Sequence, residues 1–195
     1  MRTLKQLCLL LLIAILLSSC NNPFRPELKD SSGIDDEQLN STPEKLLHNL
    51  ERAYQEKNID LYLSLLHPDF RFELIASEVS QIGVDWNNDQ ISDSWWGYEQ
   101  EREYTVRMFT EGSSDGVYPP PDDISLRLQI PPQDKWEKDS TVGHEDWIII
   151  SCNFDLILSY IGTNSSLNAN GKASFYLRPV GNRWYIAIWR DESYI

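Results

Sequence analysis

The side chains best suited to covalent chemistry in this chain are its 3 cysteines and 3 histidines. Two of the cysteines, Cys8 and Cys20, belong to an N-terminal segment in which a basic start precedes an apolar run from Leu7 to Leu17. A positive start, a short apolar run and small residues before a cleavage point are typical of a secretory signal. The run is shorter than the roughly 20 apolar residues that span a bilayer. Cys20 therefore lies at the expected cleavage point, and Cys8 would leave with the signal.

The residues at this point, Leu17-Ser18-Ser19-Cys20, resemble the lipobox of bacterial lipoproteins. The resemblance implies that residues 1–19 are removed and that Cys20 receives lipid, so that the membrane holds the chain through the lipid on Cys20. Asn21 is not the Asp that retains lipoproteins in the inner membrane of some bacteria. The expected location is the cell envelope, on the outer side of the cytoplasmic membrane or in the outer membrane. The alternatives are an ordinary signal peptide and a signal-anchor helix, and Pro23 argues against the anchor helix.

The remaining reactive side chains are predicted to be structural. Cys152 would be the one unmodified thiol after cleavage, and it lies in the alternating segment 150–160. This pattern predicts a buried, inert cysteine that acts as a small apolar side chain. His48 lies beside the apolar stripe of an expected helix, His67 at a helix end and His144 in a charged loop. We expect all three histidines to be structural or solvated rather than catalytic.

Four oxygen-bearing side chains follow the spacing of a calcium-binding loop: Asp85, Asn87, Asp89 and Asp93. Oxygen ligands at alternate positions suit Ca²⁺, and Ile91 would add a carbonyl group. The sixth position is Gln90 instead of glycine, and the twelfth is Trp96 instead of the bidentate glutamate. The match is weak, so the sequence favours a polar loop without a metal, and it indicates no cofactor.

Aromatic side chains gather in the same region: Trp86, Trp95, Trp96 and Tyr98. Aromatic rings line pockets for apolar ligands and sugars, and they also fill protein cores without any ligand. The cluster is therefore a candidate wall of a small-molecule cavity, with plain core packing as the alternative.

The formal net charge of −13 at pH 7 disfavours nucleic acid as a partner, because nucleic-acid-binding proteins carry basic patches. It also disfavours adsorption of the folded surface on anionic lipid. Residues 20–40 combine prolines, serines and acidic side chains without apolar periodicity, which predicts a flexible tether. Residues 41–195 are then long enough for one folded domain.

The elements that position these residues can be predicted from local patterns. Thr42-Pro43-Glu44 is typical of a helix start, and leucine spacing extends this helix to about residue 54. A second helix is expected from Asp60 to His67, where Pro68 would end it. A strand at 70–74, a helix over 95–109 and an exposed loop over 131–146 are also expected. Further strands are expected at 124–130, 147–160, 173–177 and 183–190, with Gly181-Asn182 in a hairpin. Helices followed by strands predict an α+β domain, with helices on one face of an antiparallel sheet.

Two stretches resemble the nuclear transport factor 2-like superfamily, which includes SnoaL-like and ketosteroid isomerase-like proteins. They are 42–74, with Leu65-Leu66-His67-Pro68-Asp69-Phe70, and 172–191, with Gly181-Asn182-Arg183-Trp184-Tyr185. The resemblance implies a cone, in which a strongly curved antiparallel sheet wraps around the N-terminal helices and leaves a cavity. The fold hosts isomerases, dehydratases, cyclases and binding domains, so it does not fix the function.

Ketosteroid isomerase-like members use an Asp base after the second helix and a Tyr of the first helix. The matching positions here are Leu74 and Leu50, which cannot exchange a proton. We therefore expect a non-catalytic domain that binds a small apolar or amphipathic ligand, or a protein partner. One alternative is a cyclase- or dehydratase-type enzyme that uses Asp155 or Glu73, although both alternate with apolar residues as outward-facing positions do. Another is a structural envelope protein, and a homodimer through the open sheet face is possible in either case.

Overall fold

The computed structural model describes residues 39–75, 79, 85, 89–113 and 116–192. The signal segment and Cys20 lie outside these residues. Helix α2 covers Pro43–Gln55, and the Thr42 side chain caps it by accepting a hydrogen bond from the Lys45 backbone N–H at 3.2 Å. Leu39 and Asn40 are already buried ahead of the helix. The packed domain therefore includes the last residues of the segment expected to act as a tether.

Helix α3 covers Ile59–Leu65 and is shorter than predicted. The expectation that Pro68 ends this helix is wrong, because strand β1 spans Leu66–Glu73 and includes Pro68. The pairing of β1 with strand β7 shifts register between Leu66 and Arg71. A proline has no N–H to donate to the sheet, so such an irregularity accommodates it.

The helix predicted over 95–109 is wrong at its start. Trp95–Gly97 form strand β2, which pairs antiparallel with β1, and helix α5 covers only Tyr98–Val106. The π-helical turn η1, Arg107–Glu111, follows directly. Helical spacing was a poor guide here because bulky aromatic residues suit a strand and β1 offers a partner for it.

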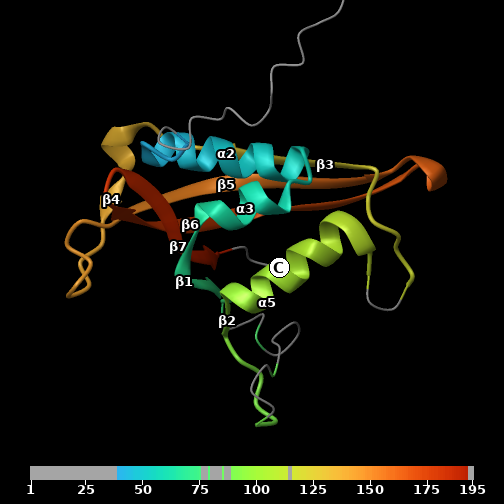
Figure 1. Cartoon of the computed structure of the whole chain (residues 1–195), viewed down its shortest axis with the longest axis horizontal. Helices are drawn as coiled ribbons and strands as arrows, with labels where there is room; N and C mark the ends of the chain where they lie inside the picture. Colours follow the sequence, from blue (N-terminus) through green and yellow to red (C-terminus); the bar gives the residue numbers. More distant parts are fainter. Residues whose placement is uncertain (1–38, 76–78, 80–84, 86–88, 114–115, 193–195) are drawn as a thin grey trace, which may run out of the picture. The chain divides into compact units, whose positions relative to one another are not determined.

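Within the described residues, seven strands form one sheet in the order β2-β1-β7-β6-β5-β3, and β4 (Glu137–Lys138) pairs with β5 outside this path. The remaining strands are β3 (Asp123–Gln129), β5 (Ile148–Tyr160), β6 (Ser165–Val180) and β7 (Arg183–Asp191). Every pairing is antiparallel except β1 with β7, so the expected antiparallel sheet is in fact mixed. The predicted fold class is confirmed as α+β, with a strongly curved sheet packed against helices (Figure 1).

Strand β6 begins eight residues before its predicted start at Ala173. The added segment lacks apolar alternation, and it forms because β5 pairs with it continuously, from Ile148 with Leu177 to Tyr160 with Ser165. The short 3-10 turn η3 (Ile161–Thr163) connects the two strands. The predicted loop over 131–146 contains β4 and the 3-10 turn η2 (Gln133–Lys135), so it is partly regular.

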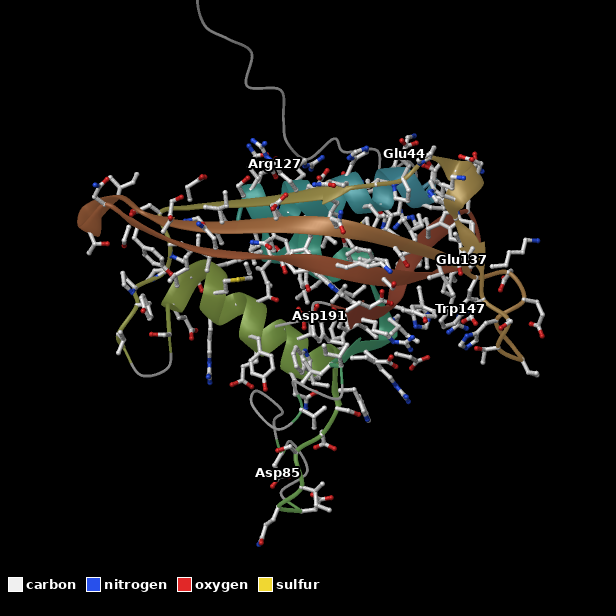
Figure 2. The ribbon with its side chains drawn as sticks, turned by 180° about the vertical axis from the view of Figure 1, so that it is seen from behind. Glu44, Asp85, Arg127, Glu137, Trp147 and Asp191 are labelled. Carbon is white, nitrogen blue, oxygen red and sulfur yellow. The ribbon has the colours of Figure 1, made fainter. Side chains whose placement is uncertain are left out.

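The two faces of the sheet differ in what covers them. Ile124, Leu126 and Leu128 of β3 are buried on the face that packs against α2. Figure 1 shows α2, α3 and α5 on this side, and in Figure 2, seen from behind, β5 and β6 lie in front of α3. The outer face carries mainly polar side chains and forms a shallow groove of about 360 Å³ that includes Arg127 and Asp155. It is the open sheet face expected of the fold.

Aromatic side chains fill the space between the helices. Tyr54 of α2, Tyr62 of α3 and Phe109 of η1 meet edge to face, with ring centroids 5.4 to 6.2 Å apart. Such contacts add about 0.5–1.5 kcal/mol per pair beyond the burial of apolar area. The three rings therefore tie the three helical segments to one another. No helix within the described ranges has the length and apolar character needed to cross a membrane.

Cys152 is buried, as the alternation of β5 predicts, with 4 % of its surface exposed. Burial, with a smaller contribution from the Glu51 carboxylate, raises the pKa of its thiol from 9.0 to about 11. Because the thiolate is the reactive form, we expect iodoacetamide to label native Cys152 at least ~100-fold more slowly than Cys152 in urea-unfolded protein. Peptide mass spectrometry measures both rates, and equal rates would contradict the register of β5.

Candidate ligand-binding site

An apolar cavity of about 410 Å³ lies where the end of α5 and η1 face the far ends of β5 and β6. Its lining residues are Tyr104, Arg107, Met108, Gly112, Ser113, Tyr118, Pro119, Pro121, Leu158, Tyr160 and Leu167. In Figure 1 the chain that follows α5 and the tip of the β5–β6 hairpin lie at the same end of the domain. The volume is within the range of small-molecule sites, about 300–1,000 Å³.

A tight turn after η1 positions one wall of the cavity. Gly112 has a φ of 90°, and a Cβ there would come within 2.3 Å of the Tyr118 carbonyl oxygen. Ser113 donates its backbone N–H to that carbonyl at 2.8 Å, and its hydroxyl accepts the Tyr118 N–H at 2.8 Å. The turn therefore needs glycine, and it places the Tyr118 ring 6.1 Å from the ring of Tyr160.

Charged groups contribute little to this wall. Among the described residues that line the cavity, Arg107 is the one charged side chain, and its guanidinium lies 2.5 Å from the Glu103 carboxylate one turn earlier. The other polar side chains are the hydroxyl groups of three tyrosines and Ser113. A wall of rings and aliphatic groups with a few hydroxyls suits an uncharged and mainly apolar molecule.

Exposed apolar side chains border the mouth of the cavity. Tyr118 and Leu167 line it and are 46 % and 41 % exposed. Their neighbourhood adds Val117 and Ile161, which are 65 % and 77 % exposed. Single exposed apolar residues are ordinary, but these four come from two segments that meet beside one cavity. Apolar side chains therefore surround the opening of the cavity as well as lining its interior.

A buried carboxylate lies between the helices, outside the wall of the apolar cavity. Glu101 is 6 % exposed, and its oxygens accept hydrogen bonds from the Tyr62 hydroxyl at 2.5 Å and the Thr105 hydroxyl at 3.1 Å. The indole N–H of Trp96 donates a third hydrogen bond to Glu101 at 2.6 Å. The carboxylate therefore connects α3, β2 and α5.

The electrostatics of this cluster follow from its burial. Burial raises the pKa of Glu101, and the hydrogen bonds from Tyr62, Trp96 and Thr105 oppose that rise. Burial and the adjacent Glu101 charge raise the pKa of Tyr62 well above its ordinary 10.0, so Tyr62 stays protonated and donates. Since core donors occupy both oxygens of Glu101, the role of this carboxylate is structural: it holds α3, β2 and α5 together.

The aromatic residues singled out in the sequence lie in different environments: Trp86, Trp95, Trp96 and Tyr98. Trp86 falls outside the described residues. The Arg71 guanidinium lies 4.6 Å from the ring of Trp95, while Trp96 stacks on Phe72 with centroids 4.3 Å apart. Tyr98 lines a separate open pocket beside the start of β1. The link to the apolar cavity is indirect, through Trp96 and the edge of Tyr104 at 5.4 Å.

The calcium-loop candidate forms a hydrogen-bonded turn where it is described. The Asp85 carboxylate accepts the backbone N–H groups of Asp89 and Gln90 at 3.0 and 2.8 Å, and Asp89 accepts that of Ile91 at 2.8 Å. Figure 2 shows Asp85 in a loop that projects away from the sheet. Asn87 is outside the described residues, and within them no three His, Cys, Asp or Glu side chains group as metal ligands.

Each of the 3 histidines has a hydrogen-bonding partner: His48 with Glu51 at 2.8 Å, His67 with the Asp69 N–H at 3.1 Å, and His144 with Asp139 at 2.6 Å. His144 also stacks on Trp147 with centroids 3.7 Å apart. None of these histidines lines the apolar cavity. The contacts of His144 instead order the loop between β4 and β5.

The two carboxylates considered as catalytic candidates face away from the apolar cavity. Asp155 is exposed in the polar groove of the outer sheet face. Glu73 accepts two hydrogen bonds from the Arg190 guanidinium, at 2.9 and 2.7 Å. The sequence analysis missed Glu101, although its spacing from Tyr98, Thr105 and Phe109 places it on one helix face.

No family model and no curated protein matches the sequence. Among solved structures, a proposed aromatic ring hydroxylase from Novosphingobium aromaticivorans matches at 16% identity and a TM-score of 0.52, covering 83% of this chain and 91% of that chain. A proposed scytalone dehydratase from the same organism matches at 8% identity and a TM-score of 0.53, covering 78% and 81%. A nuclear transport factor 2-like superfamily protein from Salmonella enterica matches at 12% identity and a TM-score of 0.49, covering 77% and 87%. At these identities the likeness concerns the fold alone, and this chain shares its α+β fold with the two Novosphingobium proteins, whose TM-scores exceed 0.5.

Proposed function

We propose that this chain is a lipid-anchored binding protein of the bacterial cell envelope. Its folded domain would hold a small apolar or amphipathic molecule in the apolar cavity without converting it. The observation that carries the proposal is the cavity of about 410 Å³, lined by three tyrosine rings and the side chains of Met108, Leu158 and Leu167. Sites of this size and composition bind small molecules in many proteins.

The absence of acid–base groups at two positions supports binding over isomerisation. Leu50 and Leu74, which match the phenol and base positions of ketosteroid isomerase-like proteins, are both buried in the core. Neither side chain can carry a proton during a reaction. Turnover of an enolisable ketone that depends on one carboxylate of this domain would contradict a non-catalytic role.

One observation favours a second candidate, an enzyme of the dehydratase or cyclase type. Glu101 is a buried carboxylate with a raised pKa, and such groups are common among catalytic acids. Its three hydrogen-bonding partners come from the core, and it does not line the apolar cavity. We therefore keep binding as the proposed function. A homodimer through the polar outer sheet face is compatible with either role.

The binding proposal predicts that a charge at the cavity mouth weakens ligand binding. Leu167 lines the cavity and is partly exposed, so Leu167→Arg can place its charge in the mouth while the domain stays folded. For an uncharged probe such as N-phenyl-1-naphthylamine, we expect an affinity loss of at least about tenfold, given the apolar area lost. Quenching of tryptophan fluorescence reports binding, because Trp96 contacts Tyr104 of the wall.

The matched control for this experiment is Val142→Arg. Val142 is 94 % exposed and belongs to the loop between β4 and β5. The Val142→Arg variant adds the same charge away from the cavity, so we expect it to bind the probe with the affinity of the wild type. A set of apolar and amphipathic compounds that leaves the tryptophan spectrum of the wild type unchanged would favour a structural or protein-binding role.

The anchor is part of the proposal and is supported by the sequence at residues 17–20. Each lipid CH₂ group buried in a bilayer contributes about 0.8 kcal/mol, and a single acyl chain holds a protein only marginally. The acyl chains of a bacterial lipoprotein would together make attachment permanent. The strongly acidic composition, with a net charge of −13, agrees with a domain held by lipid rather than by its own surface.

A further inference from the structure

The most deeply buried tyrosine of the cavity wall has a hydroxyl group without a protein partner among the described residues. Tyr160 is 7 % exposed and lines the cavity, yet its hydroxyl makes no hydrogen bond to any residue within the described ranges. Among the described residues, the Tyr160 oxygen does not belong to the fully buried side-chain atoms that lack a hydrogen bond, a set that includes Asn40 Oδ1. Because it has no partner and is not in that set, the oxygen keeps some accessible surface and is not sealed in the core.

Buried tyrosine hydroxyl groups ordinarily find a partner, because burying an unpaired polar group is unfavourable. The buried Tyr62 follows that rule, and so does the half-buried Tyr176. The Tyr62 hydroxyl donates to Glu101 at 2.5 Å, and the Tyr176 hydroxyl accepts from Arg190 at 2.6 Å. Tyr160 is the exception among the buried tyrosines of the described residues, and its side chain lines the cavity in which we place the ligand.

The rest of the wall limits what the ligand can be. Arg107 is already paired with Glu103, and among the described residues no carboxylate lines the cavity. A charged ligand would lose its hydration there without gaining an unpaired opposite charge. Leu158, Met108 and the tyrosine rings offer apolar contact on the remaining surfaces. The chemistry of the wall therefore selects an uncharged molecule.

We propose that the bound molecule is uncharged and mainly apolar, and that it carries one hydroxyl or carbonyl oxygen that hydrogen-bonds to the hydroxyl of Tyr160. This inference rests on the proposed binding function and adds the class of ligand to it. Tyr160 would be the residue that distinguishes an oxygenated molecule from a hydrocarbon of the same shape.

The test compares two probes that differ only in the oxygen, butylcyclohexane and 4-butylcyclohexanol. Their dissociation constants are measured by calorimetry with the full chain in three forms: wild type, Tyr160→Phe and the control Tyr185→Phe. We expect Tyr160→Phe to weaken the alcohol relative to the hydrocarbon by about 3–10-fold, the range of one net hydrogen bond. Tyr185→Phe should leave this ratio unchanged, because the Tyr185 ring lies beside His67 and does not line the cavity.

The outcomes separate this inference from the proposed function. If the wild type binds neither probe, the binding function itself is overturned. If both probes bind and Tyr160→Phe leaves their ratio unchanged, the assignment of Tyr160 is wrong while the binding function stands. A second measurement needs no folded variant: the ¹³C shift of Tyr160 Cζ in the wild type should move with the alcohol and not with the hydrocarbon. Equal shifts with both probes would also overturn the assignment.

Discussion

Glu101→Ala is expected to lower the free energy of unfolding by at least about 3 kcal/mol. The substitution leaves the Tyr62 hydroxyl, the Trp96 N–H and the Thr105 hydroxyl without their shared acceptor. Each buried donor that loses its partner costs about 1–3 kcal/mol. Urea unfolding measures the change. The control is Glu99→Ala on the same helix, whose exposed side chain should contribute less than about 1 kcal/mol through the helix dipole.

The same carboxylate gives the domain a characteristic pH dependence. An acid whose pKa is raised on folding binds more protons in the native state than in the unfolded state. The stability contribution of Glu101 is therefore largest below its ordinary pKa of 4.5, and it is lost as the pH rises through the raised native value. In an enzyme of the kind weighed above, the loss of Glu101 would instead remove activity from a stable protein.

Glu101→Gln tests the direction of this pH dependence while it keeps a side chain of similar size. Glutamine can still accept from the hydroxyl groups of Tyr62 and Thr105, but its amide N–H₂ cannot accept from Trp96. The variant should be about 1–3 kcal/mol less stable than the wild type near pH 4.5, and the difference should shrink toward pH 8. Stability curves that stay parallel over this range would show that Glu101 does not titrate differently in the native state.

Cys20→Ala is expected to remove membrane attachment altogether. The substitution deletes the thiol that would carry lipid, so the chain should no longer incorporate labelled palmitate and should remain as uncleaved or soluble precursor. Metabolic labelling and separation of the membrane fraction measure both effects. Cys8→Ala, a cysteine change within the signal, should label like the wild type. Palmitate incorporation that persists in Cys20→Ala would refute the lipobox assignment.

Local rules predicted the elements whose ends depend on local chemistry. The start of α2 follows from the capping Thr42 and from Pro43 at the first helical position, and Gly181 takes the left-handed φ of 62° that the β6–β7 hairpin needs. The burial of Cys152 follows from the period of two in β5. In these cases the sequence signal and the physical cause lie within a few residues of each other.

The other element boundaries and both sites depend on partners that are distant in the sequence. Pro68 did not end α3, because β7 draws the chain into the sheet already at Leu66. Trp95 joined a strand because β1 was available to pair with it. The partners of Glu101 come from three elements, and the cavity wall combines residues from α5 to β6, so neither site has a contiguous sequence signature. The Tyr160 hydroxyl is informative only because no described residue forms a hydrogen bond with it.

The parallel pairing of β1 with β7 sets the order in which this sheet can be completed. β7 lies between β1 and β6, yet it is the last strand along the described chain. Until residues 183–191 are in place, the β1–β2 pair and β6 each expose an unpaired edge, and exposed edges invite pairing with other chains. Closing contacts between such distant segments is slow. A newly made chain therefore passes through a period of vulnerability to aggregation that ends only when its last strand arrives.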